Sequence, residues 1–168
     1  FDLKRLPNYQ AYLYHWLQPF GFNAWNDVYN LVDAQSGKYI LSDNFRLSKD
    51  RDFLVLEEIP LKDLQEYLVE ENTESDSPIK LSVTNVENWE NSSNPNVIFV
   101  DKEKLNFPLT IRKWRQGDYF CPFGIDGSKK VSKYFKDEKL SLSEKESKWL
   151  LLSDNQIVWI IKSAQDRR

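Results

Sequence analysis

Positive charge surrounds a tryptophan in the second half of the chain. Arg112, Lys113 and Arg115 flank Trp114 within four consecutive positions. Guanidinium groups form paired hydrogen bonds with phosphates, and both guanidinium planes and aromatic rings stack on bases. We therefore expect Arg112, Lys113 and Arg115 to contact phosphate or to stack beside Trp114. The alternative is a charged sheet edge with solvated cations and a buried tryptophan.

A row of lysines follows on a helix predicted over residues 128–138, with Ser128 as its cap. At about 100° per residue, the lysines fall opposite the apolar face of this helix. Such a row can dock on phosphates, although an ordinary amphipathic surface helix has the same pattern. No acidic residue is expected on that face, which favours phosphate binding. The row consists of Lys129, Lys130, Lys133 and Lys136.

Other reactive residue types lack the pattern of a catalytic or metal site. His15 has no Cys or acidic residue arranged around it, and Cys121 has no histidine nearby in the sequence. Cys121 is therefore predicted to be a small buried residue. One His and one Cys leave a zinc site with too few ligands. Residues 124–127 match a GXXG loop superficially, but glycines at this spacing commonly form a turn. We expect no catalytic residue and no metal site.

Acidic and basic residues are distributed unevenly along the chain. The formal charge is −3, from 23 basic and 26 acidic residues. Residues 57–107 hold four basic and twelve acidic groups, whereas residues 108–148 hold ten basic and six acidic groups. Nucleic acids respond to local positive patches, so the second segment is a candidate binding surface. The acidic segment suggests a different class of function, a protein-interaction module that docks a basic partner.

Composition limits the class of protein further. Hydrophobic residues make up 40% and aromatic residues 14%, which is enough for a packed core. No stretch approaches the ~18 uncharged apolar residues of a membrane span, so no membrane contact is expected. The chain starts at Phe1 without a signal-peptide pattern and contains no Met, which predicts a piece of a longer protein. A single cysteine fits a reducing, cytoplasmic compartment.

Local patterns predict a helical hairpin and a small β meander over residues 1–57. Apolar residues recur at helical spacing from Tyr9 to Phe20 and again from Trp25 to Val32. Asn8 and Asn23 are suitable caps for these two helices. Short β-like runs follow and are separated by turn sequences. These runs cover residues 39–41, 45–47 and 53–56.

The rest of the chain is predicted to be α+β. Residues 58–78 form a predicted connecting segment, which is polar over 70–78. Over residues 61–69 the pattern fits a helix or a strand equally well. Residues 79–168 form the predicted second domain. A capping box at Ser143–Glu146 opens a short helix. The predicted strands cover residues 79–83, 97–100, 108–115 and 156–161. The predicted core tryptophans are Trp16, Trp25, Trp149 and Trp159.

The residues from Pro108 to Asp118 follow the pattern P-L-T-x-R-x-[WR]-x-x-G-D. Pro122, Gly124, the run over 127–135 and Asp137-x-Lys139 come next, and the ending over 157–160 agrees as well. In these features the chain resembles the C-terminal domain of the tRNA(Ile)-lysidine synthase family. Residues 1–56 are similar, less specifically, to the end of that family's middle domain.

The resemblance implies a short helical hairpin with a small β meander, followed by a layered α+β domain that contains a small β-sandwich. That second domain would be similar to a domain of the phenylalanyl-tRNA synthetase β subunit. The family is an ATP-dependent ligase that joins lysine to the wobble cytidine of an isoleucine tRNA. ATP, Mg and lysine would bind in an N-terminal domain whose S-G-G-x-D-S loop this chain does not contain.

By the same resemblance, this chain would supply tRNA binding and no catalysis or cofactor site. The acceptor stem is the expected contact, and a homodimer of the full-length protein is compatible with the family. The chain departs from the family's ending W-[VI]-x-G-x-R-x-D-x-R, because Lys162 replaces the Gly and Ala164 the first Arg, while Asp166 and Arg168 fit. No tRNA contact of that first Arg is expected here.

Overall fold

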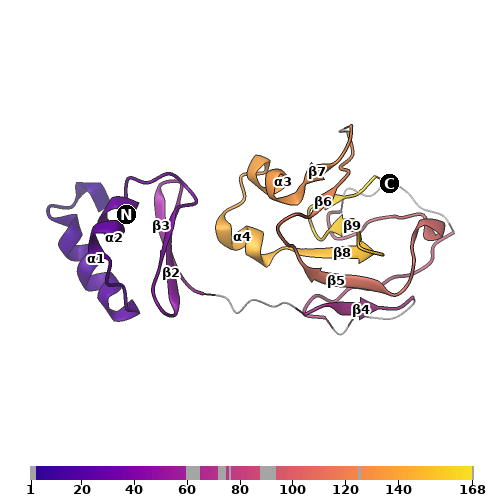
Figure 1. Ribbon diagram of the computed structural model, residues 1–168, viewed down its shortest axis with the longest axis horizontal. Helices are drawn as coiled ribbons and strands as arrows, with labels where there is room; N and C mark the ends of the chain where they lie inside the picture. The colour runs from indigo at the N-terminus through magenta and orange to yellow at the C-terminus, as the bar shows by residue number, and fades with distance from the viewer. Residues whose placement is uncertain are drawn as a thin grey trace. The chain divides into compact units, whose positions relative to one another are not determined.

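The computed structural model describes residues 3–59, 65–71, 75, 77–87, 94–124 and 126–167. It divides the chain into two units, Phe1–Lys62 and Asp63–Arg168, whose helices and strands are labelled in Figure 1. Each unit has its own buried hydrophobic residues. Within the described ranges, no helix has both the length and the apolar character needed to cross a membrane.

The first unit contains two short helices and a three-stranded antiparallel sheet in the order β1-β2-β3. Leu13 and Leu17 of the first helix and Val28 of the second share one core with Leu47 of the sheet. The predicted helical hairpin and meander are therefore confirmed. The elements are α1 (Tyr9–Leu17), α2 (Trp25–Leu31), β1 (Tyr39–Leu41), β2 (Phe45–Asp50) and β3 (Phe53–Glu58).

The ends and faces of these helices differ from the prediction. Asn8 has a left-handed backbone, with φ 62°, and its side chain makes no capping hydrogen bond. Ala24, and not Asn23, occupies the cap position of α2. Trp16 was predicted in the core but is 47% exposed, because Leu13 and Leu17 are the α1 residues that face the core.

A five-stranded antiparallel sheet in the order β10-β9-β8-β5-β4 organises the second unit (Figure 1). Its central strand β8 is buried at every position, because one sheet face packs around Trp149 and Leu151 and the other around Leu150 and Leu152. The strands are β4 (Tyr67–Val69), β5 (Leu109–Lys113), β8 (Trp149–Ser153), β9 (Gln156–Ile160) and β10 (Ala164–Gln165).

One face of this sheet carries the elements of the basic segment. The strands β6 (Tyr119–Phe120) and β7 (Lys129–Lys130) pair as a separate hairpin, and α3 (Val131–Asp137) follows β7 directly. Phe120 of β6 and Phe135 of α3 are fully buried in the same core as Leu150 of β8.

A further short helix, α4 (Leu142–Ser147), precedes β8. Its capping box uses Ser141 and Glu144, so the predicted box at Ser143 lies two positions too late.

The structure draws the domain boundary earlier than the sequence suggested. Tyr67–Val69, predicted within the connecting segment, is strand β4 and pairs with β5, whereas residues 61–64 lie outside the described residues. Ser75 and Ser77, predicted in a polar loop, are each 8% exposed, and both hydroxyls donate to the carbonyl oxygen of Ile79. The five-stranded sheet therefore includes part of the predicted connecting segment.

Two predicted strands are absent from the three sheets of the described chain. In residues 79–83, Ile79, Leu81 and Val83 pack against the core as their alternation predicts, but these residues belong to none of the sheets. Residues 97–100 are likewise outside them, and the Phe99 carbonyl oxygen accepts a hydrogen bond from the Gln165 side chain.

Candidate nucleic-acid interface

Arg112 is turned into the protein at the end of β5. Its two terminal nitrogens donate to the two carboxylate oxygens of Asp118 at 2.9 and 2.8 Å, and the residue is only 9% exposed. A buried guanidinium that already holds a carboxylate in this paired geometry has no free edge for a phosphate. We therefore leave Arg112 out of the proposed interface, although the sequence made it a candidate.

The pair between Arg112 and Asp118 organises the turn that follows β5. Asp118 also accepts a hydrogen bond from the backbone N–H of Arg115 at 2.7 Å, and Gly117 has φ 103°. The predicted Gly-Asp turn is thus confirmed. The carbonyl oxygen of Asp118 accepts a hydrogen bond from the N–H of Val131, the first residue of α3, at 2.9 Å. The turn therefore fixes where α3 begins.

The other candidates around the tryptophan also have partners in the protein. The Lys113 ammonium lies 4.3 Å from the centre of the Trp149 ring and donates to the Ser147 carbonyl at 3.0 Å. Trp114 is half-buried and meets Phe135 edge to face, at 5.4 Å between ring centres. Arg115 forms an ion pair with Glu66 at 2.9 Å, with each side chain 49% exposed. Of these three, Arg115 keeps the most accessible charge.

The predicted row of lysines is divided between a strand and a helix. Lys129 and Lys130 form β7, so α3 carries only Lys133 and Lys136. The helix was predicted to begin at Ser128, but strand pairing with β6 holds Lys129 and Lys130 extended. All four predicted lysines nevertheless lie within one continuous segment of hairpin and helix.

Asp137 is an acidic residue inside this lysine cluster, so the predicted absence of acid there is wrong. Its carboxylate lies 2.8 Å from the Lys129 ammonium, whose side chain is only 16% exposed. The hydrogen bond from Lys129 is the main cause that lowers the pKa of Asp137, and the positive charges of Lys129, Lys133 and Lys136 lower it further. Three lysines thus act electrostatically on one carboxyl.

Three of the four predicted lysines remain exposed. Lys130, Lys133 and Lys136 are all solvent-exposed. In the part of the chain that the structure describes, they form no hydrogen bond or ion pair with another side chain. We call Lys130, Lys133 and Lys136 the lysine surface. Unpaired ammonium groups on a well-packed helix and strand are available to phosphates.

The sequence reasoning missed two exposed aromatic side chains in the segment between β5 and α3, which also contains Lys130. Tyr119 is 59% exposed and Phe123 is 66% exposed. Tyr119 lies directly opposite Lys130 in the β6–β7 register. Because side chains alternate along a strand and Phe120 is fully buried, Tyr119 and Lys130 share the outer face of the hairpin. The position of Phe123 between Pro122 and Gly124, directly before the turn predicted over 124–127, was the available signal.

The C-terminal segment holds the start of the β6–β7 connection in place. Asp166, 6% exposed, accepts a hydrogen bond from the Cys121 N–H at 2.7 Å. The Arg167 N–H donates to the Cys121 carbonyl at 2.9 Å, and Pro122 forms a bridge with Asp166.

Cys121 is buried with a free thiol, as predicted. Gly124 and Gly127 have φ 77° and 89°, the left-handed backbone that glycine adopts in turns, whereas residue 125 of the predicted turn lies outside the described residues.

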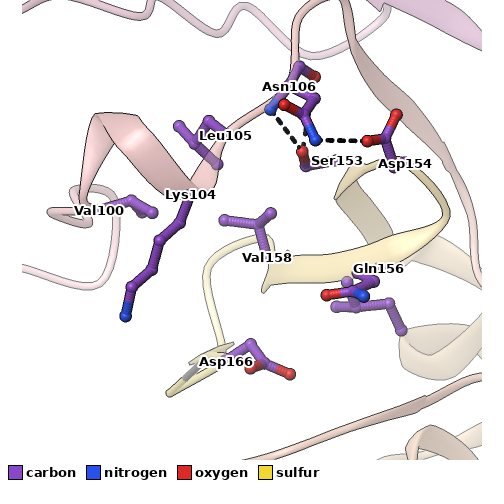
Figure 2. Close-up of a pocket in the computed structure, with 10 residues that line it drawn as sticks. Val100, Lys104, Leu105, Asn106, Ser153, Asp154, Gln156, Val158 and Asp166 are labelled. Atoms are coloured by element: carbon purple, nitrogen blue, oxygen red, sulfur yellow. Dashed lines mark hydrogen bonds between the residues drawn. The ribbon is translucent and has the colours of Figure 1, made fainter.

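A cavity of about 430 Å³ lies beside β9, between the β8–β9 turn and the segment before β5 (Figure 2). Its polar groups bond one another: the Asn106 backbone N–H donates to the Ser153 hydroxyl at 2.9 Å, and the Asn106 amide donates to Asp154. Among the described residues, no cluster of His, Cys, Asp and Glu could hold a metal ion. We assign no ligand to this cavity.

Two family models match the chain. The TilS substrate binding domain matches residues 2–59, and the TilS substrate C-terminal domain matches residues 109–166. The second match contains β5, the β6–β7 hairpin and α3, and therefore the whole lysine surface.

Curated relatives agree with these matches. The tRNA(Ile)-lysidine synthase of Parabacteroides distasonis is 36% identical over 172 residues, which cover 99% of this chain and 39% of that protein. The synthase of Bacteroides thetaiotaomicron is 35% identical over 96% of this chain and 37% of its own length. That of Bacillus subtilis is 36% identical over 97 residues, 56% of this chain. The chain thus spans about two fifths of the length of the first two relatives. The resemblance found in the sequence is confirmed: the chain belongs to the tRNA(Ile)-lysidine synthase family.

Proposed function

We propose that this chain is the tRNA-binding portion of a tRNA(Ile)-lysidine synthase, and that its lysine surface contacts tRNA phosphates. The observation that carries the proposal is the exposure of Lys130, Lys133 and Lys136 within the matched C-terminal domain. Phosphate contacts fix the position of a nucleic acid without reading its sequence. The proposed substrate is an isoleucine tRNA, contacted at its acceptor stem.

The proposed activity of the whole protein is ATP-dependent ligation of lysine to the wobble cytidine of that tRNA. ATP, Mg and lysine would bind in another domain, because this sequence has no glycine-rich loop that could cradle phosphates. A cytoplasmic location accompanies the proposal, since Cys121 is a free thiol. A homodimer of the full-length protein stays a prediction.

The experiment is tRNA binding at several salt concentrations. The test variant replaces Lys130, Lys133 and Lys136 by Gln, which removes the three charges and preserves helix propensity at Lys133 and Lys136 of α3. Each lost phosphate contact lowers the steepness of log K against log salt by about 0.7 to 0.9, so three contacts lower it by about two or more. The matched control replaces three exposed lysines elsewhere in the second unit, which are Lys80, Lys104 and Lys162.

We expect the control variant to bind with nearly the slope of the unmodified chain. A folded test variant with unchanged affinity and slope would overturn the lysine surface as a binding site. A module that docks a basic partner through residues 57–107 is not favoured, because the matched family domains are substrate domains. Absence of tRNA binding even at low salt would contradict the proposed function altogether.

We also expect the chain by itself neither to hydrolyse ATP nor to exchange pyrophosphate with it. The measurement is isotope exchange between pyrophosphate and ATP, with and without tRNA. An exchange activity that survives repurification of the protein would show a catalytic site in this chain and would contradict the assignment to substrate binding.

A further inference from the structure

We propose that Tyr119 and Phe123 form a stacking site for unpaired nucleotides on the β6–β7 hairpin. The inference rests on the proposed function and deepens it. The lysine surface would hold phosphates, whereas these two rings would bind bases that are not paired in a helix. Single-stranded nucleic acid is commonly held by this combination of stacking rings and neighbouring cations.

The exposure of the two rings is unusual within this unit. Tyr119 and Phe123 are 59% and 66% exposed. The other aromatic residues described between positions 65 and 167 are all buried or half-buried, including Trp114, the candidate that the sequence favoured for stacking. The sheet and α3 thus use the other described aromatics of the unit in packing and leave these two rings accessible.

The backbone between the two rings is anchored at two residues, Phe120 and Cys121. Phe120, next to Tyr119, is fully buried in the core. The backbone N–H of Cys121, two positions before Phe123, donates to the Asp166 carboxylate, and its carbonyl oxygen accepts a hydrogen bond from the Arg167 N–H. Because the supporting backbone is already ordered, less conformational freedom is lost when a ligand stacks on the rings.

Charge and reach favour a short single strand over a protein partner. Lys130 lies directly opposite Tyr119, so a cation sits beside one of the rings. Four chain steps separate Tyr119 from Phe123, which places their Cα atoms at most about 14 Å apart. Stacked bases repeat every ~3.4 Å along one strand, so a strand of about five unpaired nucleotides spans even this upper limit and reaches both rings.

The experiment compares two RNA probes with the same stem. One hairpin ends blunt, and the other carries a single-stranded extension of about five nucleotides, the length that spans both rings at ~3.4 Å per stacked base. We expect the unmodified chain to bind the extended probe more tightly. A Tyr119→Leu, Phe123→Leu variant should lose at least about five-fold of that preference, because base–aromatic stacking contributes ~1–3 kcal/mol per base. Its salt slope should stay unchanged, because the lysines are intact.

A conservative variant separates ring stacking from other roles of these positions. Tyr119→Phe combined with Phe123→Tyr keeps both π faces and should keep the preference for the extended probe. In a Phe123→Trp variant, the additional tryptophan emission relative to the unmodified chain should be quenched by the extended probe and not by the blunt one. Thermal melts of each variant establish that the fold is retained.

The outcomes distinguish this inference from the proposed function. If the folded double-Leu variant keeps the full preference, or the unmodified chain shows none, the stacking site is wrong while salt-dependent tRNA binding stands. If the Gln variant of the lysine surface loses slope but keeps the preference, the two sites act separately, as proposed. If neither probe binds at low salt, both the proposed function and this inference are overturned.

Discussion

The neighbouring carboxylate decides what each cation of the basic segment can do. Arg112 is held by Asp118 and Lys129 by Asp137, at 2.8 Å in both pairs. Lys133, in contrast, is exposed and without an ion pair in the described chain. Residues of one charge type, close together in the sequence, therefore divide into structural cations and cations available to a ligand.

Removal of the acid from the lysine cluster should strengthen RNA binding. Asp137→Asn releases Lys129 and removes one negative charge that repels phosphates, so we expect tighter tRNA binding. The plot of log K against log salt should become steeper by up to about 0.9, which corresponds to one additional phosphate contact. The measurement is binding at several salt concentrations. Glu138→Gln, on the adjacent exposed position, is the control, and equal effects of the two substitutions would show that only net charge matters.

The titration of Asp137 gives a direct test of its contact with Lys129. The pKa of Asp137 is lowered from its ordinary 3.8, chiefly by the Lys129 hydrogen bond. The interaction therefore stabilises the fold above the ordinary pKa and is lost as the pH falls through the lowered value. Carboxyl NMR should show a depressed pKa that returns toward 3.8 in Lys129→Gln. An unchanged pKa in that variant would refute the assigned contact.

At the scale of elements, short polar motifs set where the helices α3 and α4 of the second unit begin. In the turn formed by residues 115–118, the Asp118 carbonyl oxygen accepts a hydrogen bond from the N–H of Val131, the first residue of α3. Ser141 and Glu144 close a capping box around the first turn of α4. The lysine surface depends on the turn over residues 115–118, because Lys133 and Lys136 lie on α3.

Loss of the Asp118 carboxylate should destabilise the second unit strongly. Asp118→Asn leaves the Arg112 guanidinium buried without its charge partner, and breaking such a buried pair costs about 3 kcal/mol. Urea denaturation measures this loss. Asp126→Asn is the control, because Asp126 is exposed and pairs with Arg167 at 3.5 Å; we expect less than about 0.5 kcal/mol there. Similar losses in both variants would contradict a special role for the buried pair.

The position of the α4 cap can be tested with two serines. Ser141→Ala removes the side chain that accepts the Glu144 N–H and should cost about 1 kcal/mol. Ser143→Ala, within the exposed part of the same helix, should be neutral or slightly stabilising, since Ala favours a helix more than Ser does. Thermal melts compare the two variants. A larger loss of stability in Ser143→Ala would support the capping box predicted at Ser143 and contradict the one observed at Ser141.

At the scale of the whole molecule, two units with separate cores share one chain. The division falls at Lys62 and Asp63, and β4 belongs to the second unit through its pairing with β5. Val69 of β4 is 1% exposed and contributes to the same core as Ile111. A second unit defined without β4 would therefore lose a strand and part of its core.

Two truncations test this boundary. We expect residues 63–168 to unfold cooperatively and to retain the salt-dependent binding of the lysine surface. Residues 79–168, the domain suggested by the sequence, lack β4 and should be less stable by at least ~2 kcal/mol, from the buried Val69 side chain alone. Equal stability of the two truncations in urea would show that β4 is dispensable.

Several features could be predicted because they depend on neighbours in the sequence. Helical spacing of apolar residues located α1 and α2, and short β-like or apolar runs located β1, β5 and β9, most of β3 and half of β2. The Gly117–Asp118 turn followed from local backbone chemistry. In contrast, β8 was not predicted, because a strand buried on both faces has no alternation to detect.

The sequence by itself therefore determined the α+β class, the family and the segment that carries the positive charge. Only the tertiary structure decided which residues of that segment face solvent. Arg115 meets Glu66, 49 positions earlier, and Cys121 meets Asp166, 45 positions later. In the folded chain Arg112 is buried and Trp114 is half-buried, whereas Tyr119 and Phe123 remain exposed. The physical reason is that burial and ion pairing depend on neighbours in space, which local spacing in a sequence does not encode.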